Sequence, residues 1–117
     1  MTQSPQSSDL PIEIDVASVN AMQNNGDDFL LLDVRESSEY ETAKIDGSVL
    51  IPMNDIGERI GELESYRDRL IVVHCHHGGR SLKVTHALRY NGFAKVQNMT
   101  GGIDQWSSEI DDSVPRY

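Results

Sequence analysis

The chain has 117 residues, 38% of them hydrophobic, and a formal net charge of −9. This length accommodates one domain with a modest core, and the acidic balance argues against nucleic acids and anionic membrane surfaces as partners, because both are negatively charged. A single cysteine rules out an internal disulfide, no run of about 18 apolar residues is present, and the start lacks the basic and apolar segments of a signal peptide, so we expect a cytoplasmic protein.

The first third of the chain predicts an edge strand, a helix and a buried strand. Residues 1–9 are rich in Ser and Gln and are expected to form a flexible arm. Residues 12–14 alternate apolar and charged side chains, as in a short edge strand. Asp15 is a favourable N-cap for a helix to about residue 24, and Gly26 is a favourable stop. The run FLLLDV at residues 29–34 is typical of a strand buried on both faces.

The remaining elements alternate in the same way. Helical patterns occupy residues 36–44, 54–64 and 81–90, with a final helical turn at 103–106, and short apolar runs predict strands at residues 49–51, 70–73 and 95–98. Strands that alternate with helices favour parallel pairing with helices on both faces. We therefore predict one α/β domain at residues 10–110, followed by a loose acidic tail at residues 111–117.

The segment after the strand at residues 70–73 carries the chemistry. Cys75 follows this strand, and sites in open parallel sheets lie at the carboxyl ends of strands. Gly78 and Gly79 leave room for backbone N–H groups to turn inward, and the following helix points its positive end at the same centre. Arg80 can bind an anion through two parallel hydrogen bonds. We therefore expect a lowered pKa for Cys75 and attack on an anionic substrate that contains sulfur or phosphorus.

Two other interpretations of this cysteine are weaker. A small core cysteine is common at the end of a strand, but it needs neither a glycine-rich turn nor a neighbouring cation. A metal site built from His74, Cys75, His76 and His77 is disfavoured, because consecutive residues cannot all converge on one ion. Alternation along the chain would point His74 and His76 away from Cys75. We expect neither a metal nor a cofactor.

Other side chains that could bind a ligand have simpler explanations. His76 and His77 could take part in proton transfer, but a solvated position at the rim of the loop is the commoner case for such residues. Tyr90 and Trp106 are expected to pack inside the domain rather than to bind a substrate. His86, within the helix after the loop, is expected to be a structural or surface residue.

Four segments, taken in chain order, form a recognisable pattern. They are Asp33-Val34-Arg35 with Glu39-Tyr40, Ile45-Asp46-Gly47-Ser48 to Ile51-Pro52, Cys75-His76-His77-Gly78-Gly79-Arg80, and Gly101-Gly102-Ile103 with Trp106. Together they resemble the rhodanese homology domain in its single-domain sulfurtransferase form, over about residues 12–108. The resemblance implies a five-stranded, mostly parallel sheet with helices on both faces.

The resemblance also implies roles for individual residues. Cys75 would accept a sulfane sulfur, from thiosulfate or a persulfide, and pass it to a thiophilic acceptor such as cyanide or a thiol; donor or acceptor could also be a protein. Asp33 and Arg35 would brace the loop through polar contacts, or would form an ion pair on the surface. The substrate would be bound by Arg80 together with its neighbours His76, His77, Gly78, Gly79 and Ser81.

Loop length separates the competing chemistries. Four residues lie between Cys75 and Arg80, whereas related phosphatases of the same fold have a loop longer by one residue, so sulfur transfer is favoured over dephosphorylation or arsenate reduction. His76 stands where thiosulfate-preferring members often have Arg, which points to a persulfide donor. Lys44 stands where the family usually has His. A non-catalytic sulfur carrier or protein-binding module remains the alternative function.

Overall fold

The computed structural model of the protein describes residues 10–117, so the predicted arm at residues 1–9 lies outside the described part. The strands are β1 (Glu13–Ile14), β2 (Phe29–Asp33), β3 (Val49–Leu50), β4 (Leu70–His74) and β5 (Val96–Met99). The helices are α1 (Val16–Asn25), α2 (Ser37–Thr42), α3 (Ile56–Arg59), α4 (Gly79–Tyr90) and α5 (Gly102–Glu109), with 3-10 helices η2 (Met53–Asp55) and η3 (Ile60–Tyr66) on either side of α3. The five strands form one sheet in the order β1-β5-β4-β2-β3, and each of its four strand pairs is parallel.

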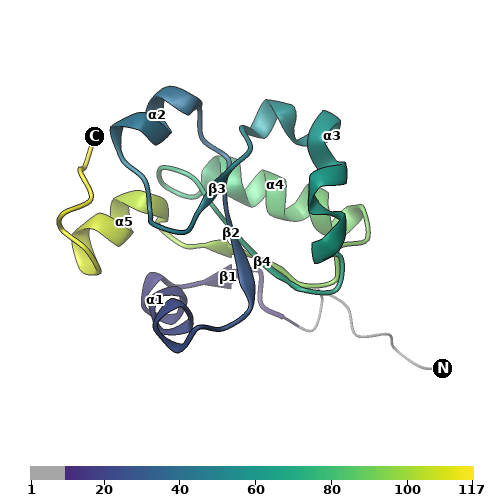
Figure 1. The fold of residues 1–117 in the computed structure, drawn as a ribbon, viewed down its shortest axis with the longest axis horizontal. Coiled ribbons are helices and arrows are strands. Elements are labelled where there is room, and N and C mark those ends of the chain that lie inside the picture. Colours follow the sequence, from purple (N-terminus) through teal and green to yellow (C-terminus); the bar gives the residue numbers. More distant parts are fainter. Residues whose placement is uncertain (1–9) are drawn as a thin grey trace.

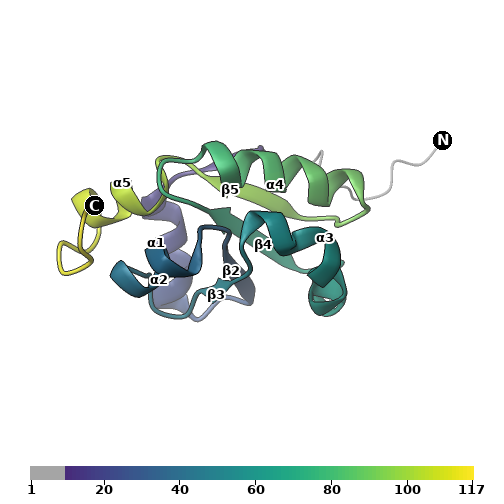
Figure 2. The same cartoon turned by 90° about the horizontal axis from the view of Figure 1, so that it is seen from above.

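Helices cover both faces of this sheet, which confirms the predicted fold class (Figures 1 and 2). On one face, α3 and α4 pack on a cluster that includes Ile71 and Val73 of β4. On the other face, α1 and α5 pack on a cluster that includes Val72. Successive residues of a strand point to opposite faces. Position 74 therefore shares the face of Val72, and position 75, directly after β4, shares the face of Val73.

The ends of α1 and the centre of the sheet are where the local sequence rules place them. The Asp15 carboxylate accepts a hydrogen bond from the backbone N–H of Ser18 at 2.7 Å, as an N-cap does. Gly26 ends the helix at a φ of 69°, in the left-handed region that glycine tolerates. The central strands β2 and β4 pair along their whole length, and Leu31 and Val72, which face each other, are both buried.

Three predictions that concern the helices differ from the structure. Residues 54–64 do not form one helix but parts of η2, α3 and η3, and Gly57 and Gly61, which lower helix propensity, lie within this stretch. The last helix is longer than the predicted turn and spans Gly102–Glu109. Tyr90 is 92% exposed at the last turn of α4, so the expectation that it packs inside is wrong.

The segment at residues 111–117, expected to be loose, packs against the domain. Val114 is buried in the cluster beneath α1 and α5. Arg116 pairs with Asp104 of α5 at 3.0 Å, and Tyr117 reaches residues of the β2–α2 region. In Figure 1 this yellow segment lies beside α5 and turns toward α2. It is therefore part of the folded unit.

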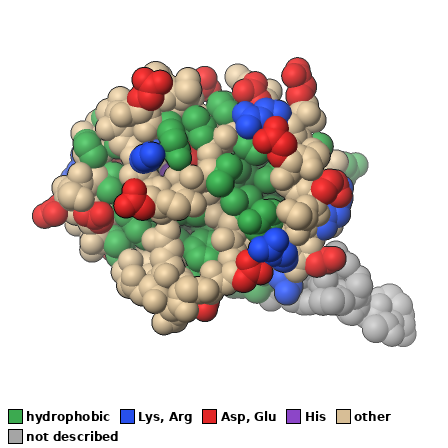
Figure 3. Space-filling view, viewed as in Figure 1, with side chains coloured by type: hydrophobic (Ala, Val, Ile, Leu, Met, Phe, Trp, Pro, Cys, Tyr) green, Lys and Arg blue, Asp and Glu red, His purple; other side chains and the backbone are tan. Residues whose placement is uncertain are grey.

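Acidic side chains are spread over the surface rather than gathered at one place. The space-filling view shows them at several separate places on one face, with many of the Lys and Arg side chains next to them (Figure 3). Three exposed arginines of the domain pair with carboxylates in this way: Arg59 with Glu62, Arg67 with Glu64, and Arg69 with Asp28. The net charge of −9 is thus distributed, and any anion-binding site has to be built locally.

Candidate active site

Cys75 lies at the carboxyl end of β4, and its sulfur is surrounded by hydrogen-bond donors. The backbone N–H of Gly78 donates to Sγ at 3.1 Å and that of Ser81 at 3.4 Å. The Ser81 hydroxyl donates to the same sulfur at 3.3 Å. The residue is only 1% exposed and belongs to the apolar cluster under α3 and α4. Its sulfur therefore lies at the floor of a bowl made by the loop and the start of α4.

These donors decide the charge of the cysteine. Burial raises the pKa of the Cys75 thiol, but the hydrogen bonds from the Ser81 hydroxyl and from the backbone N–H groups of Ser81, Gly78 and Arg80 outweigh it, so the pKa lies below its ordinary value. A lowered pKa increases the fraction of thiolate, which is the nucleophilic form. The loop therefore favours a reactive sulfur at a buried position.

Gly78 makes the inward turn of the N–H groups feasible. It is the N-cap of α4 and has a φ of 115°, which residues other than glycine rarely adopt. Among residues 10–117, only glycines have positive φ values. Gly79 is the first residue of α4, and space for a side chain is open there, so the tight turn depends on Gly78 rather than on Gly79.

The start of α5 holds the loop from its carbonyl side. The backbone N–H of Ile103 donates to the carbonyl oxygen of Cys75 at 2.9 Å, and that of Asp104 donates to the carbonyl of His76 at 3.1 Å. Gly102 lies so close that a Cβ atom there would collide with both carbonyl oxygens. The carbonyl groups thus face α5, and the N–H groups that follow are left to face the sulfur.

The guanidinium of Arg80 is bound by a carboxylate of α2. Its Nη1 and Nη2 donate to the two carboxylate oxygens of Glu39 at 2.7 and 2.9 Å. This pairing raises the pKa of Arg80 and lowers that of Glu39 to about 2. Both terminal nitrogens of Arg80 are engaged by Glu39, although the charge of Arg80 still interacts with Cys75 through space, so a substrate-binding role for its side chain stays a prediction.

Asp33 and Arg35 form a buried ion pair, so the surface alternative is wrong. Both side chains are 0% exposed, and the closest contact, from Arg35 Nη2 to Asp33 Oδ2, is 2.7 Å. Arg35 also donates to the carbonyl oxygen of Ala43 at 2.6 Å and to that of Glu39 at 3.3 Å. The pair therefore ties the end of β2 to α2. Leu32 and Val34, on either side of Asp33 in the chain, belong to the same cluster as Cys75. Because successive strand residues point to opposite faces, the pair lies on the face of the sheet opposite to Cys75.

His74 shares this second face and is also 0% exposed. Its Nε2 is 3.7 Å from Asp33 Oδ2, too far for a hydrogen bond, and neither ring nitrogen has a hydrogen-bond partner among the described residues. Burial lowers the pKa of His74 more than the charge of Asp33 raises it, so the ring is neutral. It points away from Cys75, as the alternation predicted.

The histidines after Cys75 lie at the rim, in contact with the C-terminal segment. The His76 ring stacks on the Tyr117 ring, with centroids 4.0 Å apart and 7° between the planes. His77 is exposed, and its Nδ1 is 3.9 Å from Asp104 Oδ2. Burial, and then the nearby His77, lower the pKa of His76, so His76 is neutral near pH 7.

Two residues of the site were missed by the sequence analysis as partners of the loop. Glu39 belongs to the first of the four sequence segments, and its negative charge could have indicated a pairing with the positive Arg80. Tyr117 gave no such signal, because its hydroxyl accepts a hydrogen bond from Arg35 at 2.7 Å and donates one to Glu39 at 2.9 Å only through the tertiary fold.

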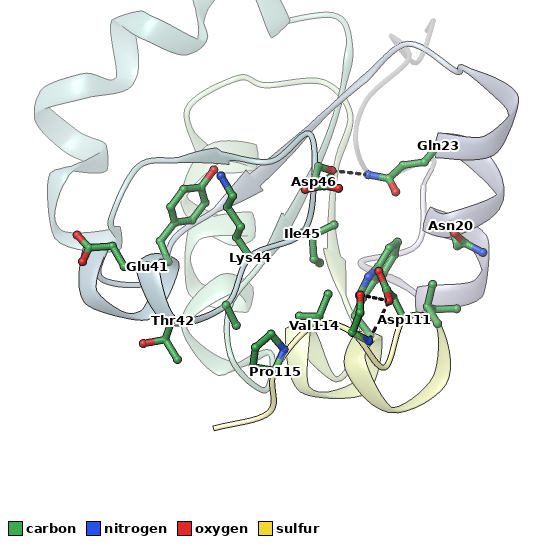
Figure 4. A pocket seen from close by; sticks show the side chains of 15 residues that line it. Asn20, Gln23, Glu41, Thr42, Lys44, Ile45, Asp46, Asp111, Val114 and Pro115 are labelled. Atoms are coloured by element: carbon green, nitrogen blue, oxygen red, sulfur yellow. Dashed lines mark hydrogen bonds between the residues drawn. The ribbon is translucent and has the colours of Figure 1, made fainter.

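A hollow of about 750 Å³ opens elsewhere on the surface. It lies between α1, the segment from Tyr40 to Asp46 and the end of α5, with Trp106 and Val114 in its lining (Figure 4). Lys44 also lines this hollow, whereas Cys75 and its loop do not.

No group of three metal-ligating His, Cys, Asp or Glu side chains occurs within residues 10–117. The helices of the same range are too short or too polar to cross a membrane.

Comparisons with known proteins agree with this geometry. The family model described as Rhodanese-like domain matches residues 15–109. A protein of Allochromatium vinosum named sulfurtransferase is 33% identical over 95 residues, which cover 81% of this chain and 87% of that protein. The crystal structure of a rhodanese-related protein from Thermoplasma volcanium is 30% identical and has a TM-score of 0.73, covering 90% of this chain and 96% of that one.

Other relatives are longer proteins. A rhodanese-like/PpiC domain-containing protein of Arabidopsis thaliana, named as chloroplastic, is 36% identical over 95 residues, which cover 78% of this chain but only 31% of that protein. The chain therefore spans about a third of the length of this relative. Given its chloroplastic name, a cytoplasmic location for this chain stays a prediction.

Proposed function

Because the chain belongs to the rhodanese-like domain family, we propose that it is a sulfurtransferase that carries a sulfane sulfur on Cys75 as a persulfide. The observation that carries the proposal is the convergence of two backbone N–H groups and one hydroxyl on Sγ. Donors placed in this way stabilise a thiolate before the reaction and an anionic persulfide after it. An inert core cysteine would not need them.

The first half-reaction loads the sulfur. The Cys75 thiolate attacks the outer, sulfane sulfur of the donor, so that a bond forms between Sγ and this sulfur. The bond between the sulfane sulfur and the rest of the donor breaks, and its electron pair leaves with the donor remnant. The sum is a transfer of one neutral sulfur atom, with no net oxidation and no cofactor.

The second half-reaction unloads it. An acceptor, cyanide or a thiolate, attacks the outer sulfur of the Cys75 persulfide, and the electron pair of the S–S bond returns to Sγ. The donors from Gly78 and Ser81 then stabilise the thiolate that leaves. Since Cys75 is only 1% exposed, both steps require the rim, which includes His76, to open toward the substrate.

The test is a mass measurement on the intact protein. After incubation with a panel of sulfane donors, we expect a gain of one sulfur atom in the wild-type chain and none in Cys75→Ser. Addition of cyanide or a thiol should remove the gain and release thiocyanate or a new persulfide. The proposal is wrong if no donor adds sulfur, or if Cys75→Ser still gains it. Hydrolysis of an aryl phosphate without sulfur loading would favour the phosphatase alternative instead.

A further inference from the structure

The arginine side chains around the loop are all paired with carboxylates of the protein itself. Arg80 is held by Glu39, and Arg35 by Asp33 behind the sheet. Arg116 is held by Asp104, through contacts of 3.0 and 3.1 Å. A substrate anion that approaches Cys75 therefore meets no unpaired guanidinium among these three.

The pair between Glu39 and Arg80 is fixed from several sides. Besides the two bonds from Arg80, the Glu39 carboxylate accepts a hydrogen bond from the backbone N–H of Glu36 at 3.0 Å and one from the Tyr117 hydroxyl at 2.9 Å. The side chains of Arg80 and Glu39 are only 33% and 19% exposed. Four donors on one partly buried carboxylate hold it in place, so Arg80 cannot turn to a substrate without breaking a network.

The remaining positive potential at the loop comes from backbone N–H groups, and these already donate hydrogen bonds to Cys75. The N–H groups of Gly78 and Ser81 point at Sγ itself. The ring of His76 stacks on Tyr117 rather than facing an anion. The carboxylates of Glu39 and Asp104 are balanced by Arg80 and Arg116, so the charge that remains is the net −9 of the whole chain, which repels a second negative charge. A doubly charged donor is thus poorly matched to this rim.

We propose, on the basis of the sulfurtransferase function above, that the donor for Cys75 is the persulfide of a thiol, and that Glu39 sets this preference by pairing with Arg80, which neutralises its charge and occupies both of its terminal nitrogens. A persulfide R–S–SH is neutral, or singly charged on the sulfur that is transferred. In the loading step the Cys75 thiolate bonds to this outer sulfur, the proton stays with it, and R–S⁻ leaves with the electron pair. Thiosulfate is a dianion and would leave sulfite, a second dianion, at the same rim.

The test compares two donors, thiosulfate and glutathione persulfide, by the rate at which Cys75 gains a sulfur atom in intact mass. Each rate is divided by the rate of the same donor with free cysteine, because the two donors differ in intrinsic reactivity. For the wild-type chain, we expect the normalised rate with the persulfide to exceed that with thiosulfate about tenfold, roughly the effect of one missing charged hydrogen bond. Equal normalised rates would overturn the proposal, whether or not any variant folds.

The variant Glu39→Gln then tests whether Glu39 sets the donor preference. Releasing Arg80 should raise the rate with thiosulfate about tenfold and leave the rate with glutathione persulfide nearly unchanged, and the gain should shrink at high salt. The double variant Glu39→Gln/Arg80→Ala should lose the gain. Glu62→Gln, which removes the partner of Arg59 in a more exposed Arg–Glu pair, is the control and should change neither rate. A folded Glu39→Gln protein with unchanged thiosulfate loading would overturn the role of Glu39, whereas absence of loading by both donors would overturn the sulfurtransferase function itself.

Discussion

Cys75 and His74 are neighbours in the chain and both are buried, yet they lie on opposite faces of the sheet. Three hydrogen bonds reach the sulfur of Cys75, whereas neither ring nitrogen of His74 has a partner among the described residues. The pKa of each is lowered, but the consequences are opposite. For the thiol a lowered pKa favours the charged form, and for the imidazole it favours the neutral form.

The comparison shows that burial alone does not make a reactive group. Burial by itself raises the pKa of a thiol, and only donors that turn toward the sulfur reverse that effect. The face of Cys75 obtains these donors from Gly78 and Ser81 at the start of α4. The opposite face instead contains a buried ion pair, Asp33 with Arg35, which fastens β2 to α2. One face of the strand end is therefore reactive, and the other is structural.

The largest expected effect belongs to the structural face. In Asp33→Asn, the buried Arg35 loses its counter-charge, and we expect the free energy of unfolding to fall by about 3–5 kcal/mol, since breaking a buried pair leaves an uncompensated charge. Urea denaturation followed by circular dichroism measures this change. Asp28→Asn, which breaks an exposed pair with Arg69, is the matched control and should change little. A similar change in both variants would show that the buried pair is not structural.

The next effect tests how the loop is held. Gly102→Ala should destabilise the protein by about 3 kcal/mol, because its positive φ disfavours alanine and the new Cβ collides with the carbonyl oxygens of Cys75 and His76. The reaction of Cys75 with iodoacetamide should also lose its acid-shifted pH profile. Gly57→Ala is the control, because a Cβ at Gly57 meets nothing within 4 Å. If Gly102→Ala behaves like Gly57→Ala, then α5 does not hold the loop.

A third variant removes one of the hydrogen-bond donors that distinguish Cys75 from His74. Ser81→Ala deletes the hydroxyl at 3.3 Å from the sulfur, and we expect the pKa of Cys75 to rise, because one hydrogen bond to the thiolate is lost. Thiolate is the reactive form, so the alkylation profile should move to higher pH, and the rate near pH 7 should fall by at most about tenfold. Ser107→Ala, at a buried serine of α5, should leave the profile in place. An unmoved profile in Ser81→Ala would mean that the hydroxyl does not stabilise the thiolate.

Local rules were sufficient for the sulfur loop but not for its long-range partners. A buried strand, a glycine turn and a helix start follow one another within residues 70–81, so the inward N–H groups could be predicted from local conformation alone. The expected grip of Arg80 on an anion was inferred from the same stretch. The structure pairs Arg80 with Glu39, 41 residues away, and a contact at that separation depends on where the fold places α2 relative to the start of α4.

The same limit explains the helices and the tail. Residues 54–64 have apolar side chains at helical spacing, and Ile56 and Leu63 are indeed buried, but the spacing does not show that the backbone alternates between 3-10 and α geometry. Residues 111–117 look like a solvated tail by composition. Val114 is nevertheless buried, because the two helices α1 and α5, distant in sequence, create a site for it.

Tyr117 provides the smallest and most specific test, because it links the two faces that the comparison separates. Its hydroxyl contacts Arg35 and Glu39, and its ring stacks on His76 at the rim of the loop. Tyr117→Phe keeps the ring and removes both hydroxyl contacts, so we expect a loss of about 1 kcal/mol in the free energy of unfolding, measured by urea denaturation. Loosening of Glu39 should also raise the normalised rate of thiosulfate loading slightly.

Tyr90→Phe is the matched control for this change, since Tyr90 is 92% exposed and its hydroxyl lies in solvent. Stability and donor preference should both stay at wild-type values in that variant. If Tyr117→Phe also changes neither stability nor donor preference, the hydroxyl contacts of Tyr117 with Arg35 and Glu39 do not stabilise the protein. Glu39 is then held by Arg80 and α2 alone. If instead stability falls while the donor preference stays, Tyr117 serves only the structural face, and the two faces are independent.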